Sequence, residues 1–260
     1  MGLVKIAGTT FWITGASGGI GAELARELQR RGGRIAISAR RREALDEVAQ
    51  GRMYVEPVDI TDRDAVHTAV ESVRAELGSI DVAVLNAGAW QQVSVDKFDA
   101  AAFRTQFDTN LMGTVHCIEA LLPTMLADKR GVITGMASVA GYRGLPGSEA
   151  YGSSKAALIN LLESLRGSLG PRGIRAQTIS PGFVRTDLTA SNKFPMPFLI
   201  DADQAARAIA DGIAAEKTEI VFPLPMMLMM KAARLVPNAL WPKLFARTPM
   251  ARGRSGRRNG

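Results

Sequence analysis

Cysteine is almost absent from this 260-residue sequence. The single cysteine, Cys117, excludes an intrachain disulfide and is typical of proteins kept in a reducing compartment. The first residues, MGLVKIAGTT, also contain no cleavable apolar run behind a basic head. We therefore expect a cytoplasmic protein.

Clusters of metal ligands and the motifs of hydrolases are missing as well. The two histidines, His67 and His116, stand in separate helical patterns, and neither a zinc-ligand spacing nor a G-x-S-x-G elbow occurs. His116 precedes Cys117, but the surrounding MGTVHCIEALL is an apolar helix pattern, which favours packing over thiol chemistry. The sequence predicts neither a metal centre nor a serine hydrolase.

Acidic residues are missing from the C-terminal end. The formal net charge is +7, and residues 231–260 contain eight Lys or Arg and no Asp or Glu, so residues 1–230 carry −1. A basic protein suggests a nucleic-acid partner, but no RNA-binding aromatic signature or heptad repeat accompanies the charge. We expect no specific nucleic-acid binding.

Short apolar segments alternate with amphipathic ones over most of the chain. This alternation predicts an α/β fold, a single doubly wound domain over residues 1–225 with a mostly or wholly parallel sheet of about seven strands. The predicted strands are TTFWIT, RIAISA, YVEPVD, IDVAVLN, GVITGMAS, IRAQTIS and EIVFP. Residues 226–247 form an apolar and basic extension, and the basic tail 248–260 is predicted to be disordered.

A glycine-rich turn, TGASGGIG, follows the first predicted strand and opens a helix. Missing side chains let backbone N–H groups and the helix N-terminus approach a pyrophosphate, although such a segment can also be only a turn. The candidate dinucleotide contacts of this turn are Gly15, Ser17, Gly19, Ile20 and Gly21.

The end of the second strand discriminates between the two nicotinamide dinucleotides. An acidic residue there suits the free ribose hydroxyl of NAD, whereas a guanidinium suits the extra phosphate of NADP. The sequence has Ser38 and Ala39 followed by Arg40, Arg41 and Arg42. We expect NADP(H) to be preferred over NAD(H), with Arg40 as the contact; the alternative is that these arginines only face solvent.

Two further segments fit a nucleotide that lies across the carboxyl ends of the strands. PVDIT places Asp59 and Ile60 at the end of the third strand, where they suit an adenine amino group and ring face. LNAG places Asn86 and Gly88 just after the fourth strand. Each segment alone is also compatible with ordinary turn chemistry.

In YGSSK, Tyr151 and Lys155 are four positions apart in a helical pattern and therefore share one helix face. With the segments above, this motif makes the chain resemble the short-chain dehydrogenase/reductase family. The motifs that carry the resemblance occur in order over residues 9 to about 225: TGASGGIG, NAG, FDTNLMG, MASVAG, YGSSK and SPGFVRT. Small departures are LNAG in place of a doubled Asn and Ala137 in place of a frequent Ser.

The resemblance implies an NAD(P)-dependent oxidoreductase that acts on a hydroxyl or carbonyl and forms a homodimer or homotetramer. It implies catalytic roles for Asn110, Ser138, Tyr151 and Lys155. It also implies that the segment after the sixth strand closes over the nicotinamide, through Pro181, Gly182, Val184 and Thr186.

Electrostatics support a catalytic reading of Tyr151. Lowering its pKa from about 10 to about 7 needs roughly 4 kcal/mol, and a cation about 4–5 Å away contributes about 3–4 kcal/mol. We expect Tyr151 to give its proton to a carbonyl oxygen that Ser138 holds, while Lys155 also grips the nicotinamide ribose and Asn110 binds a relay water. The alternative is a surface Tyr–Lys pair.

The segment DLTASNKFPMPFLIDAD has too many Pro, Asn and Ser residues for a regular element. It resembles the mobile lid of the family, and its apolar residues, with Trp90 on another loop, suit an apolar carbonyl or alcohol substrate. These side chains could equally cap the core. They are Phe194, Met196, Phe198 and Leu199.

The extension 226–247 allows three interpretations. A Met-rich segment is typical of core packing or an oligomer contact. Basic residues beside Trp241 and Phe245 suit peripheral contact with a membrane surface, although the apolar run is too short to span a bilayer. The segment could also be a flexible tail.

The sequence therefore predicts NADPH-dependent reduction of an apolar carbonyl compound, or the reverse alcohol oxidation. The alternatives are an NAD-dependent alcohol dehydrogenase and a non-catalytic NADP(H)-binding sensor or scaffold.

Overall fold

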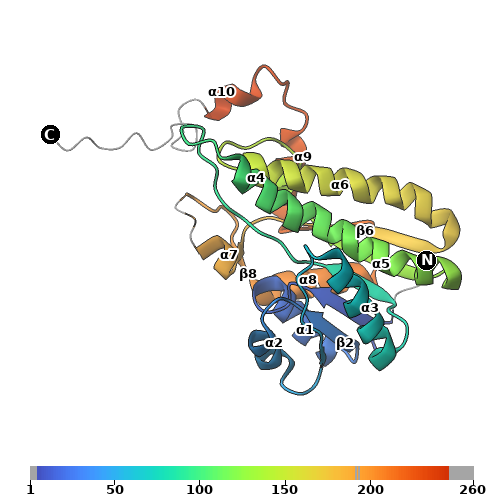
Figure 1. Ribbon diagram of the computed structural model, residues 1–260. Coiled ribbons are helices and arrows are strands. Elements are labelled where there is room, and N and C mark those ends of the chain that lie inside the picture. The colour runs from blue at the N-terminus through green and yellow to red at the C-terminus, as the bar shows by residue number, and fades with distance from the viewer. Residues whose placement is uncertain (1–4, 191, 193, 246–260) are drawn as a thin grey trace.

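Seven parallel strands form the central sheet of the computed structural model, which describes residues 5–190, 192 and 194–245 (Figure 1). The strand order is β3-β2-β1-β4-β5-β6-β9. The strands are β1 (Thr10–Thr14), β2 (Arg34–Ser38), β3 (Tyr54–Val55), β4 (Val82–Leu85), β5 (Gly131–Met136), β6 (Ile174–Pro181) and β9 (Glu219–Phe222). The prediction of a doubly wound parallel sheet is confirmed, whereas the predicted disordered tail, 248–260, lies outside the described residues.

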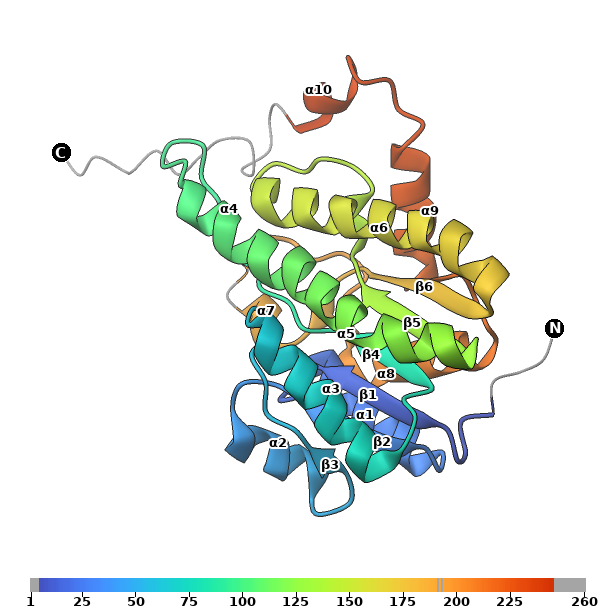
Figure 2. The same ribbon diagram turned by 45° about the vertical axis from the view of Figure 1, so that its right-hand side comes forward.

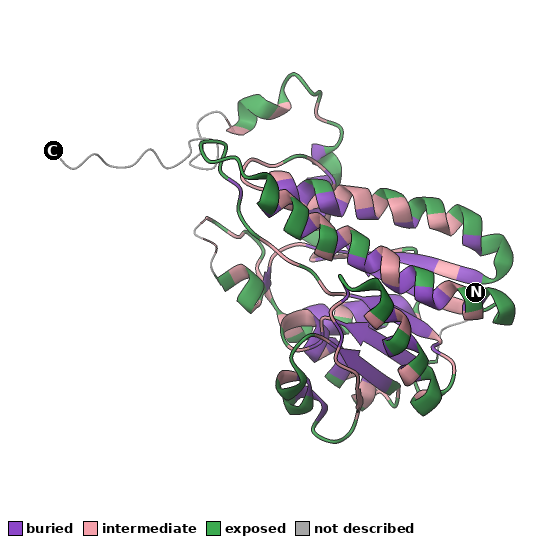
Figure 3. Ribbon diagram, in the orientation of Figure 1, coloured by how far each residue is buried: buried purple, intermediate pink, exposed green. Residues whose placement is uncertain are grey.

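Helices cover both faces of this sheet, as Figures 1 and 2 show. One face carries α1 (Gly19–Arg30), α2 (Arg42–Ala49) and α8 (Ala202–Ala214). The other carries α3 (Arg63–Leu77), α5 (Gly113–Asp128) and α6 (Glu149–Leu169). The strands are therefore buried between two helical layers, and they are largely purple in Figure 3.

The residues of β1 show why a continuous apolar run is needed in such a strand. Successive strand side chains point to opposite faces, so Phe11 and Ile13 pack toward α1 and α8 while Trp12 packs toward α3 and α5. The Trp12 indole is fully buried and its Nε1 donates a hydrogen bond to Ser38 Oγ at 2.9 Å. This bond satisfies the polar tip of the largest core side chain.

The predicted long helix before β5 is interrupted. It consists of α4 (Ala100–Phe107), a π-helical turn over Asp108–Met112 and α5. A π turn carries i→i+5 bonding and is rare outside functional sites. Its single buried residue is Asn110.

The segment after β6 is more regular than the sequence predicts. It contains β7 (Val184–Arg185) and α7 (Asp187–Ala190), and β8 (Ile200–Asp201) pairs with β7 in a small second sheet. The prediction of no regular element is therefore wrong at both ends of this segment. Side-chain bonds stabilise the turn into α7, because Thr189 Oγ1 accepts from the Thr186 N–H at 3.1 Å and donates to the Val184 carbonyl at 2.7 Å.

The chain continues beyond β9 in two helices, α9 (Leu224–Ala233) and α10 (Trp241–Phe245). Met226 and Met230 on α9 are buried in a cluster with Val139 and Tyr142. On α10, Trp241 Nε1 donates to the Gly144 carbonyl at 2.7 Å. Within the described ranges, none of the helices is long and apolar enough to cross a bilayer.

Packing of α9 on the sheet domain can be tested with adjacent methionines. Met230 is 5% exposed and Met229 is 45% exposed. We expect Met230→Ala to lower the free energy of unfolding by about 2 kcal/mol, because it leaves a cavity, while Met229→Ala changes it by less than about 0.5 kcal/mol. Urea denaturation measures both; equal small effects would mean that α9 contributes little to the folded domain.

Candidate active site

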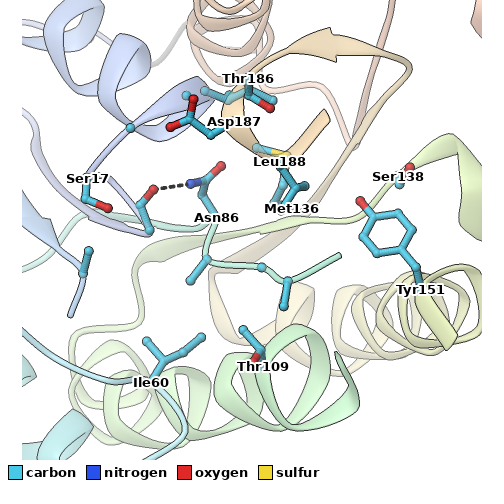
Figure 4. Close-up of a pocket in the computed structure, with 18 of the residues that line it drawn as sticks. Ser17, Ile60, Asn86, Thr109, Met136, Ser138, Tyr151, Thr186, Asp187 and Leu188 are labelled. Carbon is cyan, nitrogen blue, oxygen red and sulfur yellow. Dashed lines mark hydrogen bonds between the residues drawn. The ribbon is translucent and has the colours of Figure 1, made fainter. Parts of the chain in front are cut away.

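A cavity of about 700 Å³ opens at the carboxyl edge of the sheet, and Figure 4 shows part of its lining. Because the strands are parallel, their carboxyl ends meet at one edge, so loops far apart in sequence contribute to one site. The segments after β1, β2, β4, β5 and β6 all reach it, together with the first turns of α6. This is the edge at which the sequence motifs were predicted to converge.

The turn after β1 lies against the loop after β4 with no room for side chains. A Cβ on Gly15 would lie 2.6 Å from Ala87 Cα, and one on Gly21 would lie 2.5 Å from Asn86 Nδ2. Gly15 also has φ +66°, a left-handed conformation that favours glycine. Asn86 Nδ2 donates to the carbonyls of Thr14 and Gly15, at 3.1 and 3.0 Å, and so ties the two loops together.

The same turn presents the N-terminus of α1 to the cavity. The helix begins at Gly19, its first turn contains no acidic residue, and Gly18, Gly19 and Ile20 line the cavity. Backbone N–H groups and the positive end of the helix dipole favour an anion at this place. Glycine turn and helix N-terminus together suit a pyrophosphate.

Beyond β2, the cavity is lined by Ala39, Arg40 and Arg41. Ser38 is fully buried and accepts the Trp12 bond, so its hydroxyl faces the core. Arg40 is exposed, and the salt bridges among the described residues involve neither Arg40 nor Arg41. The cavity therefore ends at a guanidinium without a carboxylate partner, which suits a phosphate.

Asp59 and Ile60 line the cavity, but not at the end of a strand. The third strand ends at Val55, so the prediction of their position is wrong by several residues. The chain stays beside β2 because the Val58 N–H donates to the Ala39 carbonyl at 3.0 Å. Asp59 Oδ1 accepts from the Thr61 N–H at 2.9 Å and so fixes this loop by a local turn.

Asn110 is completely buried in the π-helical turn and does not line the cavity. Its Oδ1 accepts from the Ala89 N–H at 2.7 Å, and its Nδ2 donates to the Ala89 carbonyl and to Ser154 Oγ, both at 3.0 Å. These bonds join the loop after β4 to α6. The side chain is therefore engaged with protein groups, which differs from the expected role in holding a relay water.

Tyr151, Lys155 and Ser138 converge on the opposite side of the cavity. Tyr151 and Lys155 share one face of α6, as predicted, and Lys155 Nζ lies 5.6 Å from the centroid of the Tyr151 ring. Lys155 is 2% exposed, and its Nζ donates to the Met136 carbonyl at 2.6 Å. Figure 4 shows Ser138 close to the Tyr151 hydroxyl.

Burial dominates the titration of this cluster. It raises the pKa of Tyr151, an effect that a hydrogen bond with Ser138 partly offsets, and it lowers the pKa of Lys155 from 10.5 to about 7. The expected lowering of the pKa of Tyr151 by Lys155 is therefore not found in the chain alone. A buried lysine that is only partly protonated at neutral pH is too weak a cation to offset the desolvation of the phenol.

Trp90 connects the catalytic cluster to the segment after α7. Its ring packs edge-on against Tyr151 with centroids 5.2 Å apart, and its Nε1 donates to Asn192 Oδ1 at 2.9 Å. In the same segment, Phe194 packs against Phe183 at 6.0 Å, whereas Phe198 is 48% exposed. The described apolar side chains here are not part of the buried core.

Most of the residues predicted for the site line this one cavity. They are Gly15, Ser17, Gly19, Ile20, Arg40, Asp59, Ile60, Asn86, Gly88, Ser138, Tyr151, Lys155, Pro181, Gly182, Val184 and Thr186. Gly21 and Asn110 lie behind the lining and support it. Both positions are determined by contacts between distant loops.

Sequence reasoning missed several contributors. Ser154 stands beside Lys155 in YGSSK, and its bond to Asn110 makes it part of the support. Asp187 and Leu188 of α7 line the cavity, and the threonines of RTDLT are the signal that a capped helix begins there. Met136, whose carbonyl accepts from Lys155, has no signal in the sequence beyond its place at a strand end.

Comparison with protein families matches residues 9–195 to the short chain dehydrogenase model. A protein of Myxococcus xanthus described as an uncharacterized oxidoreductase is 38% identical over 92% of this chain and 97% of its own length. An uncharacterized oxidoreductase of Staphylococcus saprophyticus is 32% identical over 79% of this chain and 91% of its own length.

Solved structures give the same picture. A short-chain dehydrogenase from Streptomyces avermitilis superposes with a TM-score of 0.80 at 26% identity, covering 94% of this chain and 98% of its own. A short chain dehydrogenase from Burkholderia cenocepacia, solved in complex with NADP, has a TM-score of 0.81 at 25% identity, covering 93% and 99%.

The buried Lys155 should give the ligand-free protein a characteristic pH dependence of stability. Its pKa is about 7 in the folded protein and 10.5 ordinarily, so between these values the unfolded chain binds more protons. The free energy of unfolding therefore rises with pH in this window, by about 3 kcal/mol from pH 7 to pH 9.5. The raised pKa of Tyr151 opposes this only near and above its ordinary value.

Urea denaturation of wild type, Lys155→Met and Lys97→Met across this window tests the assignment. Lys155→Met should abolish most of the rise, whereas Lys97→Met, which alters an exposed lysine, should retain it. A rise that persists in Lys155→Met would assign it to other groups.

Proposed function

The chain belongs to the short-chain dehydrogenase family, and we propose that it is an NADPH-dependent reductase of an apolar carbonyl compound that also runs the reverse alcohol oxidation. Members of this family are oxidoreductases that bind nicotinamide cofactors and act on small molecules. The observation that carries the proposal is the convergence of Ser138, Tyr151 and Lys155 on a cavity whose far end holds a glycine turn and Arg40.

The cavity has the groups that a dinucleotide needs. A Cβ on Gly15 or Gly21 would fill the space in which the turn approaches the loop after β4, and α1 presents its N-terminus to the same space. This turn and helix would hold the pyrophosphate. Asp59 and Ile60 would contact the adenine, and the loop from Pro181 to Thr186 would hold the nicotinamide end.

Arg40 supports a preference for NADP(H). It lies at the end of β2, where the adenosine ribose would sit, and no carboxylate among the described residues competes for its guanidinium in a salt bridge. A guanidinium next to a free ribose hydroxyl gains little, whereas next to a phosphate it forms charge-assisted hydrogen bonds. The Burkholderia cenocepacia structure with NADP is a related precedent.

The chemistry at the other end of the cavity divides between three side chains. When bound, the nicotinamide supplies the hydride in reduction or accepts it in oxidation. Tyr151 gives its proton to the substrate oxygen, and its raised pKa keeps the phenol protonated and available as a donor at neutral pH. Ser138 donates a hydrogen bond to the same oxygen, so the oxygen is held while its charge develops.

Lys155 adjusts Tyr151 and Asn110 adjusts both. In its protonated form the Lys155 ammonium lowers the pKa of Tyr151 and so eases proton transfer in either direction; it would also hold the nicotinamide ribose. Asn110 acts as a positioning residue, because its amide fixes Ala89 on one side and Ser154, the neighbour of Lys155, on the other.

The surroundings of Tyr151 favour an apolar substrate. The Trp90 ring packs on Tyr151, Leu188 lines the cavity, and both Leu188 and Phe198 keep large exposed surfaces, at 42% and 48%. Apolar surface that stays exposed around a cavity is typical of ligand contact. A homodimer or homotetramer is the assembly that we propose, since proteins of this family often form oligomers.

Cofactor selectivity is tested by titrating NADPH and NADH into wild type, Arg40→Ala and Arg42→Ala. Arg40→Ala should weaken NADPH binding by about 10- to 100-fold and leave NADH binding unchanged, since only the phosphate contact is lost. Arg42 lies on α2 and does not line the cavity, so Arg42→Ala is the matched control. Equal losses for both nucleotides, or tighter NADH binding to wild type, would contradict the NADP assignment.

Proton donation by Tyr151 is tested on the ketone that an NADPH-coupled screen of apolar ketones identifies. Tyr151→Phe should lower kcat by about 10²- to 10⁴-fold while NADPH affinity is retained, because the hydroxyl acts only in the chemical step. Tyr54→Phe, which alters a tyrosine on β3 that does not line the cavity, should stay close to wild type. Undiminished kcat in Tyr151→Phe would reject Tyr151 as the proton donor.

A further inference from the structure

The helix α9 is apolar on both of its faces. Its inner face, with Met226, Met230 and Ala233, is buried against the domain. Its outer face carries Leu224, which is 61% exposed, and Leu228, which is 58% exposed. The solvent face of a surface helix normally carries polar side chains, so this outer face is unusual.

The exposed apolar surface continues along the chain to α10. Leu235, just after α9, is 84% exposed, and Leu240 and Leu244 are 50% and 60% exposed. Figures 1 and 2 place α9 and α10 at one end of the molecule, and Figure 3 shows most of this region in the colour of exposed residues. Scattered exposed leucines need no explanation, but a run of them on one segment marks an interaction surface.

The same segment has a strong charge of one sign. No Asp or Glu occurs after Glu219, and the eight basic residues from Lys231 onward give the C-terminal part of the chain a charge of +8. Among the described residues, Lys231, Arg234 and Lys243 are exposed beside the apolar side chains. Leucines interleaved with bases are the composition of a segment that lies at the interface of an anionic bilayer.

We propose that the segment from Leu224 to Phe245 docks on the surface of an anionic lipid membrane. The exposed leucines enter the boundary between headgroups and acyl chains, and the lysines and arginines lie at the lipid phosphates. A second copy of the chain is disfavoured as the occupant, because a symmetric contact would place two segments of charge +8 side by side.

The docked segment is held rigidly to the domain on its other side. Arg143 Nη2 donates to the Val236 carbonyl at 2.9 Å, and the Arg143 guanidinium lies 5.3 Å from the Trp241 ring centroid. Trp241 bonds in turn to Gly144, on the loop that runs from Ser138 to α6. Docking would therefore orient the whole domain on the membrane instead of tethering it through a loose tail.

Vesicle flotation of the full-length protein tests the proposal. We expect the wild type to float with phosphatidylcholine vesicles that contain phosphatidylglycerol, and to float far less with phosphatidylcholine alone or at high salt. The double variant Leu228→Ser/Leu235→Ser should lower the partition coefficient by at least about tenfold, because both side chains lose apolar transfer energy.

Leu126→Ser is the matched control, because Leu126 is a comparably exposed leucine, at 38%, on α5; it should float like wild type. Absence of flotation with anionic vesicles would overturn the proposal, and so would equal flotation of the double variant. Sedimentation velocity detects the competing outcome: a dimer that the double variant dissociates, without vesicle binding, would assign this surface to a second copy. None of these readouts depends on enzymatic turnover.

Discussion

The close approach of two loops at the carboxyl edge of the sheet is the constraint on which the candidate site depends. Gly15 and Gly21 leave no room for a side chain, and Asn86 closes the gap by bonding to the backbone of the turn. An added methyl at either glycine would meet backbone or a bonded amide. The nucleotide end of the cavity therefore exists because two residue types are missing side-chain atoms at the junction of β1 and β4.

Asn110 has the corresponding role at the other end of the cavity. A fully buried amide is stable only when its hydrogen bonds are satisfied, and here they reach the loop after β4 and α6 at once. The π turn presents this side chain inward between two ordinary helices. Fold and chemistry are thus coupled, since the residues that hold Lys155 in an apolar environment also determine its pKa.

The sequence predicts the sheet well because β-branched runs between glycine turns and amphipathic helices leave few alternatives. It also places most of the cavity lining, since these residues follow strand ends. It does not predict the π turn, the short β3 before Asp59 or the helix α7, because tertiary contacts determine these elements. The pKa of Tyr151 moves opposite to the expectation because the argument counted the charge of Lys155 but not the burial of both groups.

The three tryptophans of the chain occupy three regions with different roles. Trp12 lies inside the sheet and bonds to Ser38, Trp90 packs on Tyr151 and bonds to Asn192, and Trp241 joins α10 to the loop after Ser138. Because indole fluorescence follows the polarity around the ring, the molecule carries its own optical reporters. Variants that retain one tryptophan each would separate the signal of the core from that of the catalytic end and that of the C-terminal segment.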